Sequence, residues 1–463
     1  MKKLVLLILL LNGLAVYSQK KYSPQEMKVD IDSLVRYIEE THPNPYYRYS
    51  KKKFQKDIQQ LKKELNTNLS EIDFYLAFIK IISKLNDGHT GIDIPLNFYL
   101  KTNPSLLLYE FTLSPQKPYI ITGKPYTSIK NEIPKDSEII SINNISSEKI
   151  VKDIIALNTG ERDEFKAEYG ANSFFFYLDY LYHAKGTYTI AYKLNGKEQK
   201  ITVKGIPYQD YEEQAKNLKQ ENSENENHQN GKNYTLKLIP EKSTAIISFQ
   251  IFDWDGFPEF CKQAFTEIKD KKIENLIIDI RNNLGGDSDV GDELFQFFMN
   301  HPYKQYDRVI GKNSRLIKER IRAHERNGKI LTSKDLATLK KAEGVYDTIV
   351  YEEIPIRENP LRFNGKVCLL TSAQTFSSAA DFAQCFSYYK RGKIIGEETG
   401  GLVVSYGDIV SHQLPNTKLF ITISSKLYYN VGTKVNDWHG VIPDIKTPSS
   451  KALDKALEII QNQ

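Results

Sequence analysis

Cysteine is scarce in this chain, and neither sign of charge is in large excess. The three cysteines, Cys261, Cys368 and Cys385, cannot form a disulfide framework or a four-cysteine zinc site. Each stands beside apolar or aromatic residues, which is typical of small buried thiols. The 63 basic and 58 acidic residues leave a net charge of only +5. This balance does not favour nucleic acid as a partner.

Long hydrophobic runs are absent after residue 18. No later segment reaches the roughly 20 apolar residues that a membrane-spanning helix needs. The one apolar run is Met1–Ser18 (MKKLVLLILLLNGLAVYS), in which two lysines precede the apolar stretch. This pattern predicts a secretory signal peptide over residues 1–18, and no cysteine follows it to carry a lipid anchor. We therefore expect an exported protein, periplasmic or extracellular, without an integral membrane span once the signal is removed.

Metal-binding motifs are missing too. In contrast, the chain is long and rich in apolar residues. HExxH, paired CxxC and EF-hand loops do not occur, so we expect no metal and no cofactor. The 463 residues, 40% of them apolar, are enough for two or three domains with sizeable cores.

The pattern changes three times after the signal peptide. Residues 19–100 have apolar side chains at helical spacing, opened by a capping box at Ser23-Pro24-Gln25-Glu26, and predict an N-terminal helical bundle. Residues 101–208 predict a compact β-rich module with one helical stretch. Residues 209–233 are polar and predict a linker or mobile loop. Residues 234–463 alternate strands and helices, which predicts an α/β domain with a largely buried sheet.

Within the α/β domain, residues 303–360 are charged and predict a long excursion with one helix. Two loops that follow buried strands are candidates for chemistry. In Arg281–Asp287 (RNNLGGD), paired glycines let backbone N–H groups face a ligand oxygen, although a simple turn is the alternative. In Thr371–Asp381 (TSAQTFSSAAD), Ser377 begins a helix, where adjacent N–H groups can hold an oxyanion. A plain helix N-cap is the alternative role for Ser377.

Two further segments contain histidine and carboxylate side chains. One is Asp87-Gly88-His89-Thr90, just past a predicted helix, and the other is Asn436–Asp444, which contains Asp437 and His439. Taken together, the four segments supply a nucleophile, a base, an acid and glycine amides. Acyl transfer requires this set of groups.

Four ordered segments resemble the S41 family of serine peptidases, which comprises the tail-specific or C-terminal-processing proteases and their tricorn-like relatives. They are IIDIRNNLGG, LLTSAQTFSSAADFA, IIGEETGG and HGVIPDI. LNDGHTG and the β-rich module, which would correspond to a PDZ-like domain, extend the resemblance over nearly the whole mature chain. The resemblance implies an α/β fold with a ClpP/crotonase-like ββα catalytic domain, and a serine-type peptidase acting on peptide or protein substrates.

The resemblance also implies roles for individual residues. Ser377 falls on the family's nucleophile, and the amides of Ser378 and of Gly285 or Gly286 would form the oxyanion hole. One branch of the family uses a Ser–Lys dyad, but Leu402 occupies the expected place of the lysine. Because leucine cannot accept a proton, the dyad is excluded.

In the tricorn-like branch the base comes from the N-terminal region, where His89 fits, and the acid lies near the C-terminus, where Asp437 fits. Tricorn has a serine where this chain has Gly88, and a glutamate in place of the aspartate. Asp437 could reach His89 directly, through Thr90 or through water.

Alternatives remain for the base and for the function. His439 is close to Asp437 and could replace His89 as the base. His412 lies in a strand-like stretch, and His42 precedes a proline and fits a helix stop. The leading functional hypothesis is a Ser-His-Asp peptidase that works through an acyl-enzyme. The alternatives are a protein that binds peptides or apolar ligands on the same scaffold, and a crotonase-type acyl-CoA enzyme, which would leave the signal peptide unexplained.

Overall fold

The structure, a computed structural model, describes residues 20–126, 132–214 and 233–461. The predicted signal peptide lies outside these ranges. Of the predicted linker, residues 209–214 are helical and 233 is described, whereas 215–232 lie outside the described residues. Within the described ranges, no helix is long and apolar enough to cross a membrane. The three cysteines are buried and unpaired, as their apolar neighbours predicted.

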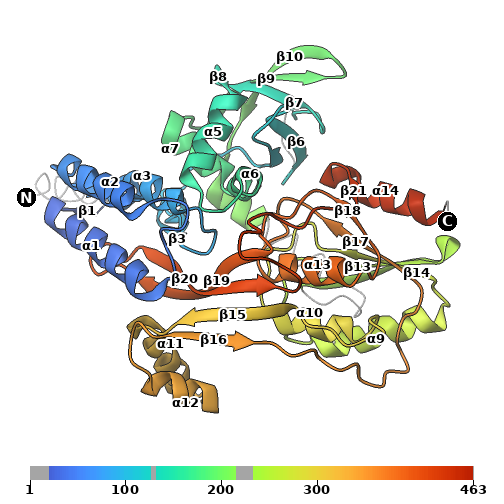
Figure 1. The fold of residues 1–463 in the computed structure, drawn as a ribbon. Helices are drawn as coiled ribbons and strands as arrows, with labels where there is room; N and C mark the ends of the chain where they lie inside the picture. The colour runs from blue at the N-terminus through green and yellow to red at the C-terminus, as the bar shows by residue number, and fades with distance from the viewer. Residues whose placement is uncertain (1–19, 127–131, 215–232, 462–463) are drawn as a thin grey trace, which may run out of the picture.

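The N-terminal part is a group of packed helices, shown in blue in Figure 1. Its elements are β1 (Lys21–Tyr22), α1 (Pro24–Thr41), α2 (Lys51–Glu64), β2 (Leu69–Ser70), α3 (Glu71–Ile82), η1 (Ser83–Leu85), β3 (Gly91–Ile92) and α4 (Leu96–Leu100). The predicted capping box forms, because Ser23 and Glu26 each accept a hydrogen bond from the other's backbone N–H. Helix α1 ends at Thr41, because Pro43 disfavours a helical conformation in the residue before it. His42 therefore leaves the helix in an extended conformation.

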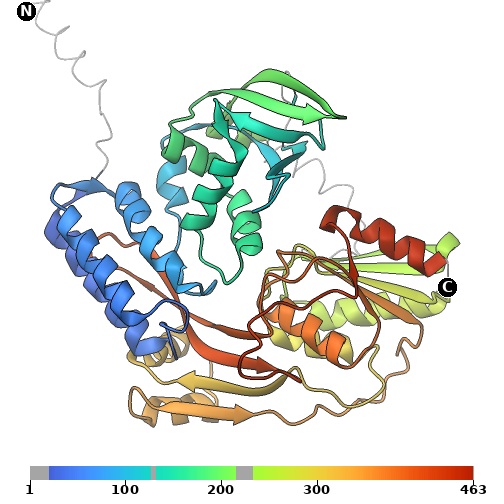
Figure 2. The same cartoon turned by 45° about the horizontal axis from the view of Figure 1, so that its top comes forward.

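The middle part is an antiparallel sheet with the strand order β10-β9-β7-β6-β5, packed against helices (Figures 1 and 2). Its elements are β4 (Ser105–Leu106), β5 (Tyr109–Leu113), β6 (Ile120–Pro125), β7 (Glu138–Ile142), β8 (Ile145–Ser146), α5 (Ser147–Leu157), α6 (Asp163–Ala171), α7 (Phe174–Tyr182), β9 (Thr187–Leu194), β10 (Lys197–Lys204) and β11 (Ile206–Pro207). The structure has three helices here where the sequence predicted one. In α7 (FFFYLDYLY) nearly every residue is apolar or aromatic, so no helical period marks it.

The C-terminal part contains a sheet with the strand order β12-β13-β14-β17-β18-β21. Its strands are β12 (Tyr234–Ile239), β13 (Thr244–Phe249), β14 (Asn275–Asp279), β17 (Lys366–Thr371), β18 (Lys393–Gly396) and β21 (Ile445–Lys446). All pairings from β13 to β21 are parallel, and β12 is antiparallel at the edge. The helices on its two faces are α9 (Phe257–Asp270), α10 (Ser288–Phe295), α13 (Ser378–Tyr388) and α14 (Ser449–Gln461).

Side chains that alternate along each strand fill the two faces of this sheet. Ile278 and Leu369 face the core with α9, α10 and α13, whereas Ile277 and Leu370 face α14. This two-sided burial explains why the strands are continuous apolar runs. Because β14 and β17 are parallel neighbours, the loops that follow them meet at one edge of the sheet.

A second sheet, ordered β16-β15-β20-β19, joins the N-terminal helices to the C-terminal part. Its strands are β15 (Tyr306–Lys312), β16 (Tyr346–Val350), β19 (Val404–Gln413) and β20 (Phe420–Asn430), and α11 (Arg315–Arg326) and α12 (Ser333–Lys340) lie between β15 and β16. Residues 303–360 thus contain two helices and two strands, whereas the sequence predicted one helix. Strand β3 pairs with β20, which ties the N-terminal helices to this sheet. The predicted α/β class, with helices and several sheets, is confirmed; likeness of the middle part to PDZ domains stays a prediction.

Candidate active site

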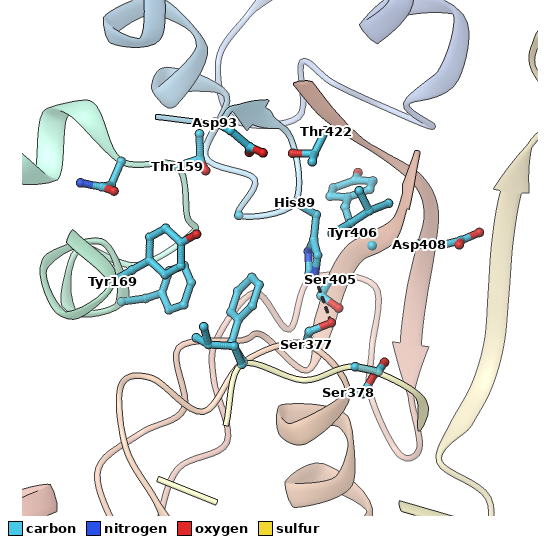
Figure 3. Close-up of a pocket in the computed structure, with 18 of the residues that line it drawn as sticks. His89, Asp93, Thr159, Tyr169, Ser377, Ser378, Ser405, Tyr406, Asp408 and Thr422 are labelled. Carbon is cyan, nitrogen blue, oxygen red and sulfur yellow. Dashed lines mark hydrogen bonds between the residues drawn. The ribbon is translucent and has the colours of Figure 1, made fainter. Parts of the chain in front are cut away.

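Ser377 stands between β17 and α13, immediately before the first residue of the helix. Its backbone has φ 52° and ψ −134°, a combination that non-glycine residues rarely adopt. The hydroxyl makes no capping hydrogen bond to α13, so the plain N-cap role does not apply. Instead, Oγ lies 3.0 Å from Nε2 of His89, which is 288 positions away in the sequence (Figure 3).

His89 belongs to the loop between η1 and β3, and the pairing of β3 with β20 brings it to Ser377. The imidazole is only 7% exposed and stacks on the ring of Phe376 at 4.7 Å between centroids. Burial lowers the pKa of His89 below its ordinary value, although the charge of Asp87 opposes this shift. The ring is therefore neutral at neutral pH and can accept a proton from a hydroxyl.

Gly88 allows the His89 loop to lie close to the Ser377 turn. A Cβ at this position would stand 2.5 Å from the ring of Phe376, the residue before Ser377. Any side chain would push the loop away from the ring, so the approach requires glycine.

Asp87 is the carboxylate that faces the other nitrogen of the His89 ring. Its Oδ1 lies 3.9 Å from Nδ1 of His89 and accepts the His89 backbone N–H at 2.9 Å. Asp87 is 1% exposed, and no hydrogen bond joins its side chain to Nδ1 of His89 among the described residues. Asp87 thus holds the loop and places a negative charge beside the ring, without a direct side-chain hydrogen bond to it.

Three donors hold the second oxygen of Asp87. Oδ2 accepts hydrogen bonds from the hydroxyls of Thr90 (2.6 Å) and Ser424 (2.7 Å) and from Nε2 of His42 (2.9 Å). Burial alone would raise the pKa of Asp87, but hydrogen bonding and the charges of His42 and His89 bring it below its ordinary value. Asp87 is therefore a carboxylate at neutral pH.

His42 is a member of the site that sequence reasoning missed. Its Nδ1 accepts the backbone N–H of Asn44 at 2.9 Å, so Nε2 carries the ring proton and donates it to Asp87. The His-Pro-Asn-Pro segment does end a helix, as predicted, but the same turn also aims the imidazole at Asp87. Nothing in the sequence connects His42 with Asp87, because the contact spans 45 positions.

The structure does not bring Asp437 to His89. Its Oδ2 accepts the backbone N–H of Lys434 at 2.7 Å within its own turn, and no contact joins it to His89 among the described residues. His439 is exposed and its Nδ1 donates to the Gly440 carbonyl at 2.8 Å, so it does not serve Ser377 as a base here. His412 lies in β19, in agreement with its strand-like sequence, and its ring packs edge-on against the ring of Tyr37 in α1.

The glycine loop and Ser378 border the nucleophile, as the meeting of the two loops requires. The Gly285 N–H donates to Asn283 Oδ1 at 2.8 Å and is therefore already used. Gly286 and Ser378 line the cavity beside Ser377, and the Ser378 hydroxyl fixes the Gly286 carbonyl at 2.8 Å. The backbone N–H groups of these two residues donate to nothing else among the described residues. Of the predicted donors, these two N–H groups, unlike that of Gly285, have no acceptor among the described residues that would compete with an oxyanion.

Both loop glycines are needed for this approach. Gly285 and Gly286 have φ values of 98° and 136°, which favour glycine. A Cβ on Gly285 would lie 2.6 Å from Cβ of Ser377, and one on Gly286 would overlap the Phe252 carbonyl.

Glu161, from the loop before α6, is a second buried carboxyl beside the pair. It is 8% exposed, and burial together with the charge of Asp87 raises its pKa to about 8. Ligand atoms of Asp87, His89 and Glu161 lie within 4.8 Å of one another, a grouping that could hold a metal ion. A cation there would have to compete with the hydrogen bonds that Asp87 already accepts.

A cavity of about 850 Å³ opens over the Ser377–His89 pair (Figure 3). All three parts of the chain contribute to its walls. Its lining residues include Tyr75, Ile79, Asp93, Leu157, Thr159, Phe165, Tyr169, Leu284, Gly286, Tyr306, Ser377, Ser378, Tyr406, Asp408, Thr422 and Tyr428. It is large enough to hold several residues of a peptide.

Residues 243–447 match the model of the family described as "Peptidase family S41". The crystal structure of mature CPAF resembles this chain with a TM-score of 0.60 and 14% identity, covering 94% of this chain and 96% of CPAF. The structure of mature CPAF complexed with lactacystin gives a TM-score of 0.60 and 14% identity, covering 95% and 98%. At this identity the likeness shows a shared fold that extends over nearly the whole described chain.

Proposed function

We propose that the protein is a serine-type peptidase that hydrolyses peptide bonds through an acyl-enzyme on Ser377, because residues 243–447 match the model of peptidase family S41. The observation that carries the proposal is the 3.0 Å contact between Oγ of Ser377 and Nε2 of His89. A neutral imidazole at hydrogen-bond distance from a hydroxyl is the arrangement that general-base activation of a nucleophile needs.

In the proposed reaction, Oγ of Ser377 attacks the scissile carbonyl while its proton passes to Nε2 of His89. The carbonyl oxygen, now negative, accepts hydrogen bonds from the backbone N–H groups of Gly286 and Ser378. His89 then gives the proton to the leaving amine, and the acyl group stays on Ser377. Water attacks the acyl-enzyme with His89 again as the base, which releases the acid product and restores the serine.

We propose Asp87, in place of Asp437, as the acid of this arrangement. When His89 gains its proton, the carboxylate 3.9 Å from Nδ1 stabilises the positive ring. The interaction is electrostatic and acts together with the fixed geometry of the loop. His42, Thr90 and Ser424 are positioning residues, because they hold Asp87 and do not touch Ser377.

The alternative function, binding without cleavage, would not require a base at the serine. In a pure binding site, we would expect His89 and Ser377 to stand well apart. Their contact, together with the strained backbone of Ser377, favours an enzyme. We further propose that the peptidase acts outside the cytoplasm, because residues 1–18 have the pattern of a signal peptide.

The test is hydrolysis of an unfolded protein such as reduced casein by the chain from Gln19 onward. Ser377→Ala should lower the rate at least about 10³-fold, since the nucleophile carries the reaction. His439→Ala is the matched control and should keep the wild-type rate, because His439 is exposed and away from the cavity. Equal hydrolysis by wild type and Ser377→Ala would overturn the proposal.

A further inference from the structure

The side chains that line the cavity over Ser377 include acidic groups but no lysine or arginine among the described residues. Four of these side chains are aspartates: Asp93, Asp287, Asp381 and Asp408. A substrate that carried a carboxylate into this cavity would meet no cationic side chain there. The contacts of each aspartate determine whether its charge is available to a ligand.

Two of the four aspartates are already engaged. Asp408 pairs with Arg320 at 3.0 Å and with Lys426 at 2.8 Å. Asp381 accepts hydrogen bonds from the Tyr306 hydroxyl and the Asn430 amide, and burial raises its pKa to about 6. Neither offers a free negative charge to a ligand.

Asp287 is engaged differently. It is the N-cap of α10, its side chain accepts the backbone N–H of Asp289 at 3.0 Å, and it is exposed. The start of the helix and this hydrogen bond therefore stabilise its charge without any ligand.

Asp93 is exposed to solvent, and it is the cavity aspartate whose carboxylate makes no hydrogen bond or ion pair among the described residues. It follows β3, and its backbone N–H donates to the Phe420 carbonyl at 2.9 Å, which fixes where the residue stands. Its carboxylate opens into the cavity. Figure 3 shows Asp93 between Thr159 and Thr422. The surrounding walls raise the pKa of Asp93, so a cation placed beside it would be favoured.

The walls beside Asp93 are apolar and aromatic. They include the side chains of Tyr75, Ile79, Leu157 and Tyr169. Burial raises the pKa of the Tyr75 and Tyr169 hydroxyls, and the charge of Asp93 adds to both shifts. Such a region suits a long side chain that has an apolar stem and a charged end.

We propose that this region is a subsite for a lysine or arginine side chain of the substrate, with Asp93 as the residue that determines the preference. The proposal rests on the peptidase function proposed above and specifies its substrate class. The stem packs against the aromatic and aliphatic walls, and the cation pairs with the Asp93 carboxylate. The substrate thus binds through a segment within its chain and not through its carboxyl terminus. A basic residue of that segment lies at a fixed position relative to the scissile bond.

The first experiment maps the cleavage sites of the wild-type chain in unfolded proteins by mass spectrometry. Lysine and arginine should be enriched at one position relative to the cleaved bond. Two peptides with the preferred sequence, one with lysine and one with norleucine at that position, then give a ratio of kcat/KM. We expect the lysine peptide to be favoured about 2- to 5-fold, the range for an ion pair with a solvent-exposed carboxylate.

Asp93→Asn should bring this ratio to near one, whereas Asp287→Asn, the matched control, should keep it. Equal cleavage of the two peptides by the wild type would overturn the proposal, and so would a preference that survives Asp93→Asn. Thermal unfolding of each variant checks that it is folded.

A binding measurement separates the subsite from the peptidase chemistry. Fluorescence anisotropy of the two labelled peptides with Ser377→Ala, with and without Asp93→Asn, reads the subsite without turnover. Tighter binding of the lysine peptide, lost with Asp93→Asn, would support the subsite even if no hydrolysis occurred. Hydrolysis by the wild type without any lysine preference would leave the peptidase proposal intact and contradict the subsite.

Discussion

Asp87 is the residue that most changes the chemistry inferred from the sequence. It lies two positions before His89, is fully enclosed, and accepts hydrogen bonds through both oxygens. Asp437, which the family pattern suggested, makes its contact within its own turn. The two aspartates can be distinguished by mutation, because only one of them faces the base.

Asp87→Asn should reduce kcat about 10²- to 10⁴-fold, because the amide cannot stabilise a protonated His89. Asp437→Asn is the matched control and should leave kcat within about twofold, as substitutions away from the site usually do. Steady-state kinetics on one peptide measures both, and circular dichroism confirms that each variant is folded. The reverse pattern, with Asp437→Asn inactive and Asp87→Asn active, would restore the acid that the sequence suggested.

The pH dependence of kcat/KM should report the lowered pKa of His89. Because the base must be neutral, activity falls as pH drops through the pKa of His89, which burial holds below 6.5. The charge of Asp87 raises this pKa, so Asp87→Asn should move the acid limb to still lower pH. A pH–rate profile of wild type and variant measures both shifts, and an acid limb centred above 6.5 would contradict the environment described for His89.

The same titration has a consequence for stability. The unfolded chain takes up a proton at the ordinary pKa of histidine, 6.5, before the folded protein does. His89 therefore lowers the free energy of unfolding as the pH falls from 6.5 towards its folded pKa. Both kcat/KM and the free energy of unfolding therefore decrease as the pH falls.

At the residue scale, the sequence pointed to Ser377 and His89 but not to their surroundings. Ser377 lies in one of the four ordered segments and His89 in LNDGHTG, with His439 left as an alternative base, and the structure brings Ser377 and His89 into contact. His42 and Ser424 reach Asp87 across 45 and 337 positions, and only the folded chain makes these contacts. Glu161 escaped notice because a carboxyl in a polar loop resembles a surface residue until its burial is known.

At the scale of elements, two loops are held in contact by glycine and aromatic packing. The His89 loop lies on Phe376 because Gly88 has no side chain, and Phe376 leads directly into Ser377. The parallel neighbours β14 and β17 bring the Gly285-Gly286 loop to the same place. The site thus depends on how closely separate elements approach one another.

Gly88→Ala should move His89 away from Ser377, because the new Cβ would stand 2.5 Å from the Phe376 ring. A displacement of about 1 Å in such a pair can cost about 10²-fold in kcat. Gly311→Ala in β15 is the matched control, since a Cβ there would meet its nearest neighbour at 3.6 Å. Steady-state kinetics measures both variants, and a fully active Gly88→Ala would show that the close approach is not required.

The elements that the sequence predicted best are those marked by a pattern within a few consecutive residues. The capping box of α1 and the continuous apolar strands of the parallel sheet appear as expected. Strands β15 (YDRVIGK) and β16 (YDTIV) were missed because neither alternates apolar with polar residues. They are stabilised by pairing with each other and by the pairing of β15 with β20. Such non-local pairing leaves no pattern in a short window of sequence.

At the scale of the whole molecule, the site exists only where three parts of the chain meet. His89 comes from the N-terminal part, Glu161 from the middle part and Ser377 from the C-terminal part. Phe165 of α6 stacks on Phe376 at 4.2 Å, and Arg162 forms an ion pair with Glu398. The middle part therefore forms a wall of the cavity over Ser377 as well as a separate sheet.

In the proposed mechanism Ser377 is a nucleophile activated by His89. Treatment of the folded chain with a fluorophosphonate, followed by peptide mass spectrometry, tests this directly. We predict one adduct, located on Ser377, which is absent in Ser377→Ala and forms much more slowly in His89→Ala. Absence of labelling in the folded wild type, or an adduct on a different residue, would contradict it.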